Sequence, residues 1–329
     1  MPQTSYLYAC ARISCLENGL LGANAVRRMA ESAPEDAMRV LTDARYGNMP
    51  DATINDLEKL IENELNRATA EIGEITPDKE LTDLFLLPAD IQNLKVLLKA
   101  RYLPNAEIVW QDGGLYTRDT LEKTVKDQEY SSFPEEIGNG LNALEEKLKI
   151  AVDPQVISVS LDKAYAAHCL KVSNGRKDAF ARSYFKAQCD FNNLLTFLRM
   201  RDIGAAKEEM KERLLPEGDI PVALLVTAYD QPLDTLPEAM KGHPAEVYLC
   251  SGLEEIARGG HIGALEKSRD DYLLSLVKSR KYDIDTIFPI IGYYLARQRE
   301  AQAIRLIMTV KRNGLDDGVI AERLRELYG

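Results

Sequence analysis

Two stretches of this chain, 100 residues apart, share one helical pattern. Residues 90–101 read DIQNLKVLLKAR and residues 190–201 read DFNNLLTFLRMR, so both follow D-x-x-N-L-x-x-x-L-[K/R]-x-R. A third, weaker version begins at Glu300, 110 residues after Asp190. With about 3.6 residues per helical turn, the acid, the leucines and the final base lie on one helix face. The pattern therefore predicts an internal repeat in which one helix is used three times.

The recurrent side chains are best interpreted as architecture. An acid near the start of a helix and a base near its end complement the helix dipole, by about 0.3–1 kcal/mol each when exposed. Since both also lie on the leucine face, we expect them to pair with neighbouring helices and to fix how helices dock. The asparagines are expected to satisfy backbone groups where helices cross, a role that Ala303 cannot take in the third copy. The repeat positions are Asp90, Asn93, Leu94, Arg101, Asp190, Asn193, Leu194, Arg201, Glu300, Ile304 and Lys311.

Other features recur in the same order along the chain. A Leu-[Asp/Glu]-Lys triplet begins at Leu57, Leu161 and Leu265, with 104 residues between successive copies. Glycine turns occur at Gly19-Leu20-Leu21, Gly114-Leu115 and Gly218-Asp219-Ile220. No segment alternates apolar and polar residues over the length of a strand, so we predict an all-α chain. The predicted domains are 1–112, 113–216 and 217–329, with the N-terminal helix packed against the C-terminal unit.

Individual helices can also be predicted from their apolar spacing and their breaks. Asn55 is a candidate N-cap for a helix that ends near Ile72. A helix that holds Leu81 to Leu86 is expected to end before Pro88, which leads into the first motif. The apolar run from Ile287 predicts one long, nearly buried helix that ends at Arg312, and a final helix is expected over residues 316–328.

Length and charge exclude several classes. A chain of 329 residues is long enough for two or three domains. A formal net charge of −11 argues against a nucleic-acid partner. No apolar run reaches the roughly 18–20 residues of a membrane span, and residues 1–5 lack the basic and apolar regions of a signal peptide, so the chain is expected to stay in the cytosol. The five cysteines are predicted to be reduced core thiols, because they are odd in number and lie within apolar helical patterns. A zinc site is not expected, because no C-x-x-C pair is present.

The residues that could carry chemistry do not form a recognisable site. His168, His243 and His261 are far apart in the sequence and lack the spacing of a metal site. The glycine pairs 113–114 and 259–260 are not part of a phosphate-binding G-x-x-x-x-G-K-[S/T] motif. We therefore predict no catalytic residue, no metal and no cofactor. An all-α enzyme that uses Asp270 and Asp271 with magnesium is an alternative, although no carboxylate follows one turn later.

Several motifs together resemble the C subunit of the bacterial and archaeal V/A-type rotary ATPases, which is equivalent to the d subunit of the eukaryotic vacuolar enzyme. The resemblance runs along nearly the whole chain. Its carriers are Tyr6-x-Tyr8-Ala9-x-x-Arg12, the two full motif copies at Asp90 and Asp190, Glu300-x-x-x-Ile304-Arg305-Leu306-Ile307, Asn313-Gly314-Leu315 and Ile320-x-x-Arg323-Leu324-Arg325-x-Leu327-Tyr328.

This resemblance implies a funnel-shaped protein of three similar helical domains with pseudo-threefold symmetry. It implies a rotor subunit that sits on the cytoplasmic face of the membrane proteolipid ring and receives the central shaft, formed by subunits D and F. ATP hydrolysis or synthesis would occur in other subunits, and this one would pass torque that drives H⁺ or Na⁺ transport. We expect exposed turns to supply the contacts with shaft or ring, with Gly113, Gly114, Gly218 and Asp219 as candidates.

A cytosolic α-helical repeat adaptor for protein partners is the main alternative. Such a protein would bind peptides or proteins in a concave groove of stacked repeats. Solenoid repeats are typically about 34–47 residues long, whereas the units of this chain are roughly 105 residues long. The length of the unit favours three closed domains over an open solenoid.

Overall fold

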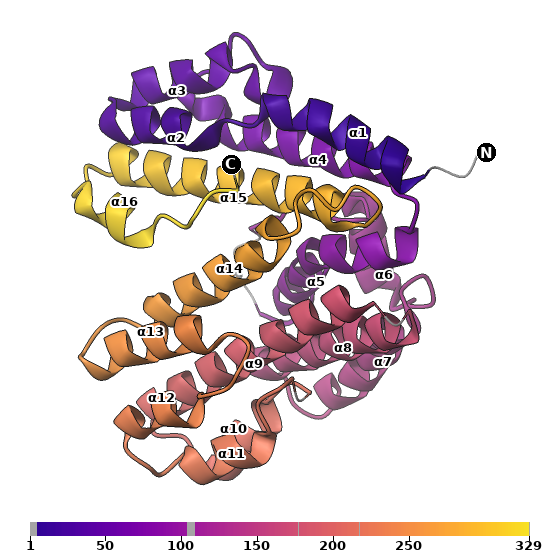
Figure 1. Ribbon diagram of the computed structural model, residues 1–329. Coiled ribbons are helices and arrows are strands. Elements are labelled where there is room, and N and C mark those ends of the chain that lie inside the picture. Colours follow the sequence, from indigo (N-terminus) through magenta and orange to yellow (C-terminus); the bar gives the residue numbers. More distant parts are fainter. Residues whose placement is uncertain (1–4, 104–108, 177, 217, 329) are drawn as a thin grey trace. The chain divides into compact units, whose positions relative to one another are not determined.

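The computed structural model describes residues 5–103, 109–176, 178–216 and 218–328. These residues form helices, turns and loops and contain no strand (Figure 1). The all-α prediction is confirmed. The chain divides into two compact units, which are described separately.

The first unit comprises residues 1–86, 112–114 and 274–329. Its central element is α15 (Phe288–Arg312), which is buried along most of its length. It packs against α1, α2, α3, α4 and α16 (Figure 1). The helices that lie wholly in this unit are α1 (Tyr6–Leu16), α2 (Gly22–Glu31), α3 (Pro34–Asp43), α4 (Leu57–Ile75), α15 and α16 (Gly318–Arg323).

The predicted long, nearly buried helix is therefore present as α15. Its apolar residues Ile304, Ile307 and Met308 are fully buried in a core shared with α2, α3 and α4. The first and last segments of the sequence thus share one hydrophobic core. Burial on several sides explains why the segment is apolar around most of its circumference rather than on one stripe.

The second unit comprises residues 87–111 and 115–273. Helices α7, α8 and α9 pack in chain order, α10 packs on α9, and α12 packs on α13. The helices that lie wholly in this unit are α6 (Arg118–Asp127), α7 (Glu135–Leu148), α8 (Pro154–Gly175), α9 (Ala179–Asp202), α10 (Lys207–Arg213), α11 (Val222–Ala228), α12 (Leu236–Ala239) and α13 (Glu246–Ala257). Two further helices, α5 (Lys79–Tyr102) and α14 (Gly263–Lys278), each have residues in both units.

Three local predictions were wrong. Helix α5 continues through Pro88. The proline removes one backbone hydrogen bond, but the buried residues on either side of it keep the helix packed. Asn55 does not cap α4, because it lies inside a short 3-10 helix, η3 (Ile54–Asp56), that leads into α4 and is itself capped by Thr53 through a capping box with Asp56. The last helix ends at Arg323, and Leu324 is already extended. The three-domain division at residues 112 and 216 stays a prediction.

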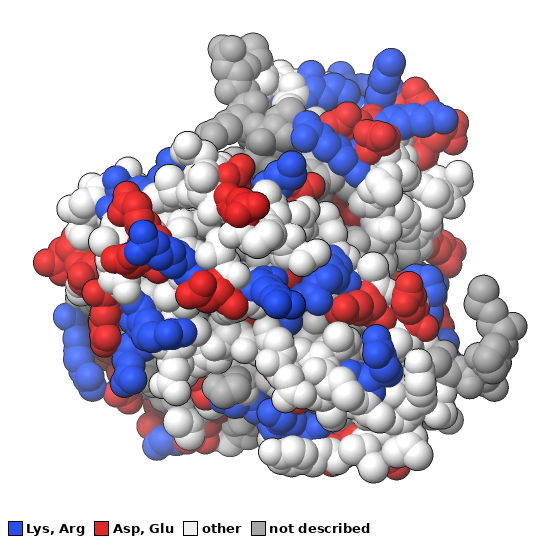
Figure 2. Space-filling view, turned by 90° about the horizontal axis from the view of Figure 1, so that it is seen from above, with Lys and Arg blue, Asp and Glu red and all other residues white. Residues whose placement is uncertain are grey.

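The charged side chains do not gather by sign on the face shown in Figure 2. Acidic and basic groups are interspersed there. Exposed charges of opposite sign also pair within one helix, as Arg118 does with Glu122 and Arg258 with Glu254. Such exposed pairs contribute about 0.3–0.5 kcal/mol each.

Candidate functional site

The first motif helix holds a loop through its buried acid. Asp90 is 1% exposed, and its carboxylate accepts hydrogen bonds from the backbone N–H groups of Leu115, at 2.7 Å, and Tyr116, at 3.2 Å. These two residues follow the glycine turn at 113–114. A carboxylate that accepts from backbone N–H groups makes charge-assisted hydrogen bonds, which are stronger than neutral ones. The acid therefore fixes the turn.

The asparagine one turn later holds the same loop at a second point. Asn93 donates to the carbonyl oxygen of Gln111 and accepts from the N–H of Gln111, both at 2.8 Å. Its side-chain amide thus replaces a backbone partner for one loop residue. We call such an acid and amide, which bind the loop at two positions four residues apart, a loop clamp.

The second motif helix repeats this loop clamp. Asp190 accepts from the N–H groups of Asp219, at 2.8 Å, and Ile220, at 3.0 Å. Asn193 accepts from the N–H of Leu215 at 2.7 Å and donates to its carbonyl oxygen at 3.3 Å. The clamped positions, 215 and 219, are four residues apart, as are 111 and 115. The sequence repeat is therefore matched by a repeat of its hydrogen bonds.

The third motif helix holds the beginning of the chain. Glu300 in α15 accepts a short hydrogen bond from the backbone N–H of Leu21, in the glycine turn that follows Gly19. Ala303 has no amide to offer at the asparagine position. Instead Arg297, one turn before Glu300, donates to the carbonyl oxygen of Gly19 at 3.1 Å and pairs with Glu300 at 2.8 Å. The third copy thus uses an arginine where the other two use an asparagine.

Arg297 and Glu300 belong to a buried ionic cluster in the first unit. Arg297 is 1% exposed and also pairs with Glu64, at 3.1 Å, while Glu64 accepts from the N–H of Gly47 at 3.0 Å. Burial raises the pKa of Glu300 above its ordinary value, although the guanidinium of Arg297 lowers it. Two buried acids around one buried base tie α4 and α15 to the N-terminal turn, so loss of one partner would leave an uncompensated charge.

The remaining repeat positions lie in the core or bind nearby groups. Leu94, Leu194 and Ile304 are fully buried. Arg101 pairs with Glu145 of α7 at 2.5 Å and donates to the carbonyl oxygen of Val125 at 2.9 Å.

The bases of the other two copies have similarly local partners. Arg201 donates to the carbonyl oxygen of Gln231 at 2.6 Å. Lys311 lies 3.8 Å from Asp317. The final base of each copy therefore binds a carbonyl group or an acid close to the end of its helix.

Close packing at Gly218 and a positive φ at Gly113 explain why these turn positions are glycine. A Cβ atom at Gly218 would lie 2.3 Å from the carbonyl oxygen of Lys186, so only glycine lets this turn approach α9. Gly113 is buried with φ of +82°, and its carbonyl oxygen accepts from Thr69 and Tyr294. Gly114 is half-buried, and Asp219, 36% exposed, pairs with Lys186 at 2.8 Å. Their contact with a partner protein stays a prediction.

One group of side chains has the composition of a metal site. Ligand atoms of Asp190, Asp219 and His243 lie within 4.8 Å of one another. However, Nδ1 of His243 accepts from the N–H of Ala245 at 3.0 Å, which places the proton on Nε2, and Nε2 donates to Asp190 at 3.1 Å. Neither ring nitrogen offers a free lone pair in this arrangement. The geometry therefore corresponds to a hydrogen-bond network around the second loop clamp.

The other candidate residues for chemistry are separated in the structure. His168 pairs with Glu136 at 2.9 Å, and Nδ1 of His261 accepts from the N–H of Gly263 at 3.1 Å. Asp270 pairs with Arg269 at 2.9 Å, so this carboxylate already faces a cation.

Within the described ranges, no helix combines the length and the apolar character needed to cross a bilayer.

Comparison with known proteins gives one consistent family. A model of the ATP synthase (C/AC39) subunit family matches residues 9–323. The C subunit of the A-type ATP synthase of Desulfurococcus sp. (strain SY) is 26% identical over 348 residues, which cover 99% of this chain and 91% of that protein. The corresponding protein of Thermococcus onnurineus (strain NA1) is 24% identical over 353 residues, covering 99% and 90%.

A relative from a sodium ATPase is similar too. The C subunit of the V-type sodium ATPase of Enterococcus hirae is 20% identical over 283 residues, which cover 83% of this chain and 83% of that protein. The resemblance drawn from the motif helices and the two ends of the sequence is thereby confirmed. The chain belongs to the ATP synthase (C/AC39) subunit family.

Proposed function

We propose that this chain is a non-catalytic rotor subunit of an A/V-type ATP synthase or ATPase. It acts as the socket between the central shaft, formed by subunits D and F, and the proteolipid ring, on the cytoplasmic side of the membrane. In this role it transmits torque for ATP-linked transport of H⁺ or Na⁺. Three similar helical domains, 1–112, 113–216 and 217–329, form its funnel. The observation that carries the proposal is the family match over residues 9–323.

The loop clamps support a mechanical role. A part that passes torque must keep its shape under load, and a loop that is fixed at two points by buried hydrogen bonds resists displacement more than a loop held by exposed contacts. Asp90, Asp190 and Glu300 each fix one turn in this way. Recurrence of the same device also favours architecture over catalysis, since a catalytic site brings unlike residues together once.

Membrane co-purification tests the proposed partners. The tagged full-length chain is expressed with the other subunits of its ATPase, extracted in mild detergent and recovered by its tag. We expect the proteolipid ring and subunits D and F in the recovered material. Recovery without these subunits, in company with unrelated soluble proteins, would favour the repeat adaptor instead.

Charge reversal tests whether the second turn contacts a partner. Asp219→Lys changes an exposed side chain on the turn, and Asp234→Lys makes the same change at an exposed position of the same unit, away from the glycine turns. We expect Asp219→Lys to lower ATP-driven ion pumping in reconstituted vesicles, while Asp234→Lys does not. Equal pumping by both variants and the unmodified complex would remove this turn from the interface.

A further inference from the structure

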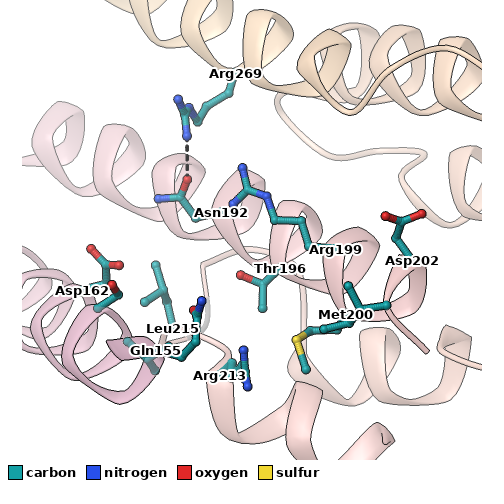
Figure 3. Close-up of a pocket in the computed structure, with 13 residues that line it drawn as sticks. Gln155, Asp162, Asn192, Thr196, Arg199, Met200, Asp202, Arg213, Leu215 and Arg269 are labelled. Atoms are coloured by element: carbon teal, nitrogen blue, oxygen red, sulfur yellow. Dashed lines mark hydrogen bonds between the residues drawn. The ribbon is translucent and has the colours of Figure 1, made fainter. Parts of the chain in front are cut away.

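The arginines around a cavity in the second unit are all paired (Figure 3). The cavity has a volume of about 630 Å³, and each of the arginines that line it lies close to a carboxylate. The pairs are Arg199 with Glu266, Arg213 with Glu209 and Arg269 with Asp270. Figure 3 shows that Arg269 also points toward Asn192, to which it donates at 2.9 Å. These guanidinium groups are compensated, so the cavity does not indicate a charged ligand.

In the first unit, by contrast, two acids compete for one base. Arg305 in α15 binds Oε2 of Glu58 in α4 through both Nε and Nη2, each at 2.9 Å. Its Nη2 atom lies 3.7 Å from Oδ2 of Asp112, which is beyond hydrogen-bond distance. The guanidinium is therefore engaged by Glu58, and the carboxylate of Asp112 is compensated only in part.

The surroundings of Asp112 favour its neutral form. The side chain is 11% exposed, and the charged groups that face it are Glu58 and Glu62 from α4 and Arg305 from α15. Burial and the two carboxylates raise the pKa of Asp112 to about 6, although Arg305 lowers it. Ionisation of Asp112 therefore places a third negative charge next to the two acids of α4.

Asp112 begins a short peptide, residues 112–114, that belongs to the first unit and docks on α4 and α15. Gly113 in this peptide is buried. Its carbonyl oxygen accepts from Thr69 at 3.0 Å and from Tyr294 at 3.2 Å, and its N–H donates to Asn66 at 3.3 Å. These three hydrogen bonds join neutral groups, so they are weaker than the charge-assisted bonds of the loop clamps. The peptide is therefore held weakly enough for one neighbouring charge to matter.

From this arrangement we propose that residues 112–114 form a pH-sensitive latch on α4 and α15. With a proton on its carboxyl group, Asp112 is accommodated beside Glu58 and Glu62, and the peptide stays docked. Without that proton, the docked state loses free energy relative to an open state in which Asp112 reaches water. The latch therefore opens more often as the pH rises through about 6. It is a property of the chain alone and does not depend on the proposed rotor role.

Amide hydrogen exchange at Gly113, followed by NMR of the full-length chain at about pH 5 and about pH 7, tests the latch. Each rate is compared with that of an unstructured peptide at the same pH, because exchange itself becomes faster with rising pH. The pKa of Asp112 is about 6 when docked, against an ordinary value of 3.8, so we expect the protection of Gly113 to fall about tenfold between the two pH values. The amide of Leu215, which Asn193 binds in the second loop clamp, should keep its protection and so exclude global unfolding.

Three variants show which group is responsible. Asp112→Asn cannot ionise, so Gly113 should keep at about pH 7 the protection that it has at about pH 5. Glu58→Gln releases Arg305 to pair with Asp112, so the fall in protection should become smaller. Glu122→Gln removes the same charge from another exposed Glu–Arg pair, in α6, and should leave the fall unchanged.

Each result either supports the latch or overturns it. Equal protection of Gly113 at the two pH values in the unmodified chain would overturn it. A fall that persists in Asp112→Asn would assign the effect to another titratable group. The same fall in Glu58→Gln as in Glu122→Gln would refute the competition for Arg305. Because the side chain of Glu58 is 69% exposed, its substitution keeps the test valid even if Asp112→Asn does not fold.

Discussion

Glu300 in the last long helix accepts a hydrogen bond from the backbone N–H of Leu21, which lies 279 positions earlier in the chain. The same kind of contact joins Asp90 to Leu115 and Asp190 to Asp219, but there the loop follows its helix by only 25 and 29 positions. The third copy of the motif is therefore completed by the start of the sequence. Substitutions at these contacts measure how much each of them contributes to the free energy of unfolding.

Leu21→Pro removes the N–H that Glu300 binds. Leu21 has φ of −66°, which proline adopts, and the preceding Leu20 is extended, as a residue before proline prefers. We expect Leu21→Pro to lower the free energy of unfolding by about 1–3 kcal/mol more than Leu21→Ala, which loses the side chain but keeps the N–H. Urea unfolding measures the difference. Equal stability of the two variants would mean that the hydrogen bond contributes nothing.

Asn193→Ala should release the loop at Leu215. The substitution leaves a backbone N–H and a carbonyl group without their side-chain partner, at an expected cost of about 1–3 kcal/mol. Asn142→Ala, on the exposed face of α7, serves as the control and should change stability by less than about 0.5 kcal/mol. Hydrogen exchange should become faster at the amide of Leu215 only in the first variant. Unchanged exchange there would contradict the clamp.

Gly218→Ala should be far more harmful than Gly73→Ala. The new Cβ would lie 2.3 Å from the carbonyl oxygen of Lys186 and 2.4 Å from the carboxylate of Asp190, so the turn must move. We expect a loss of about 1–3 kcal/mol from this overpacking. Gly73 lies inside α4 with nothing within 4 Å, so alanine there should stabilise the chain by about 0.5–1 kcal/mol. Thermal unfolding of both variants tests the contrast.

Asp112 should make stability depend on pH. Burial and the nearby carboxylate of Glu62 raise its pKa from 3.8 to about 6, although Arg305 lowers it. The folded chain therefore holds this proton more tightly than the unfolded chain, and the contribution of Asp112 to stability falls as the pH rises from about 4 to about 6.

Asp112→Asn tests this pH dependence because it cannot ionise. It should raise the free energy of unfolding at pH 7 by about 1 kcal/mol and should have no such effect near pH 4. Chemical unfolding at both pH values provides the measurement. Glu122→Gln, on the exposed surface of α6, is the control. An equal effect of Asp112→Asn at the two pH values would show that the substitution acts through packing instead.

The helices and the repeat could be predicted because apolar spacing leaves a direct trace in the sequence. Leu94, Leu194 and Ile304 recur at a helical period and lie in the core. The loop clamps could not be predicted in the same way. Asp90 and Asp190 bind backbone N–H groups, and a backbone donor exists at nearly every residue, so the partner carries no signature. Recurrence of the glycine turns was the only signal that the two features belong together.

Other errors have equally local causes. Pro88 was expected to break a helix because proline lacks an N–H, but burial of Leu86 and Leu87 outweighs one missing hydrogen bond. The role of Arg297, which binds the loop in the third copy as an asparagine does in the other two, could not be predicted either. Its contact with Gly19 spans 278 positions and comes from a residue one turn before Glu300, whereas the motif places the amide one turn after the acid.

The order in which a ribosome makes this chain gives the closure at Glu300 another meaning. The turn at Leu21 leaves the ribosome first, and its partner follows 279 residues later, so this turn must stay unpaired for most of the time that synthesis takes. Moving residues 5–31 to the end of the chain by circular permutation would place Leu21 close to Glu300 in the sequence, so that their hydrogen bond becomes a local contact. The third copy would then form as the first two do, with each turn following its own helix.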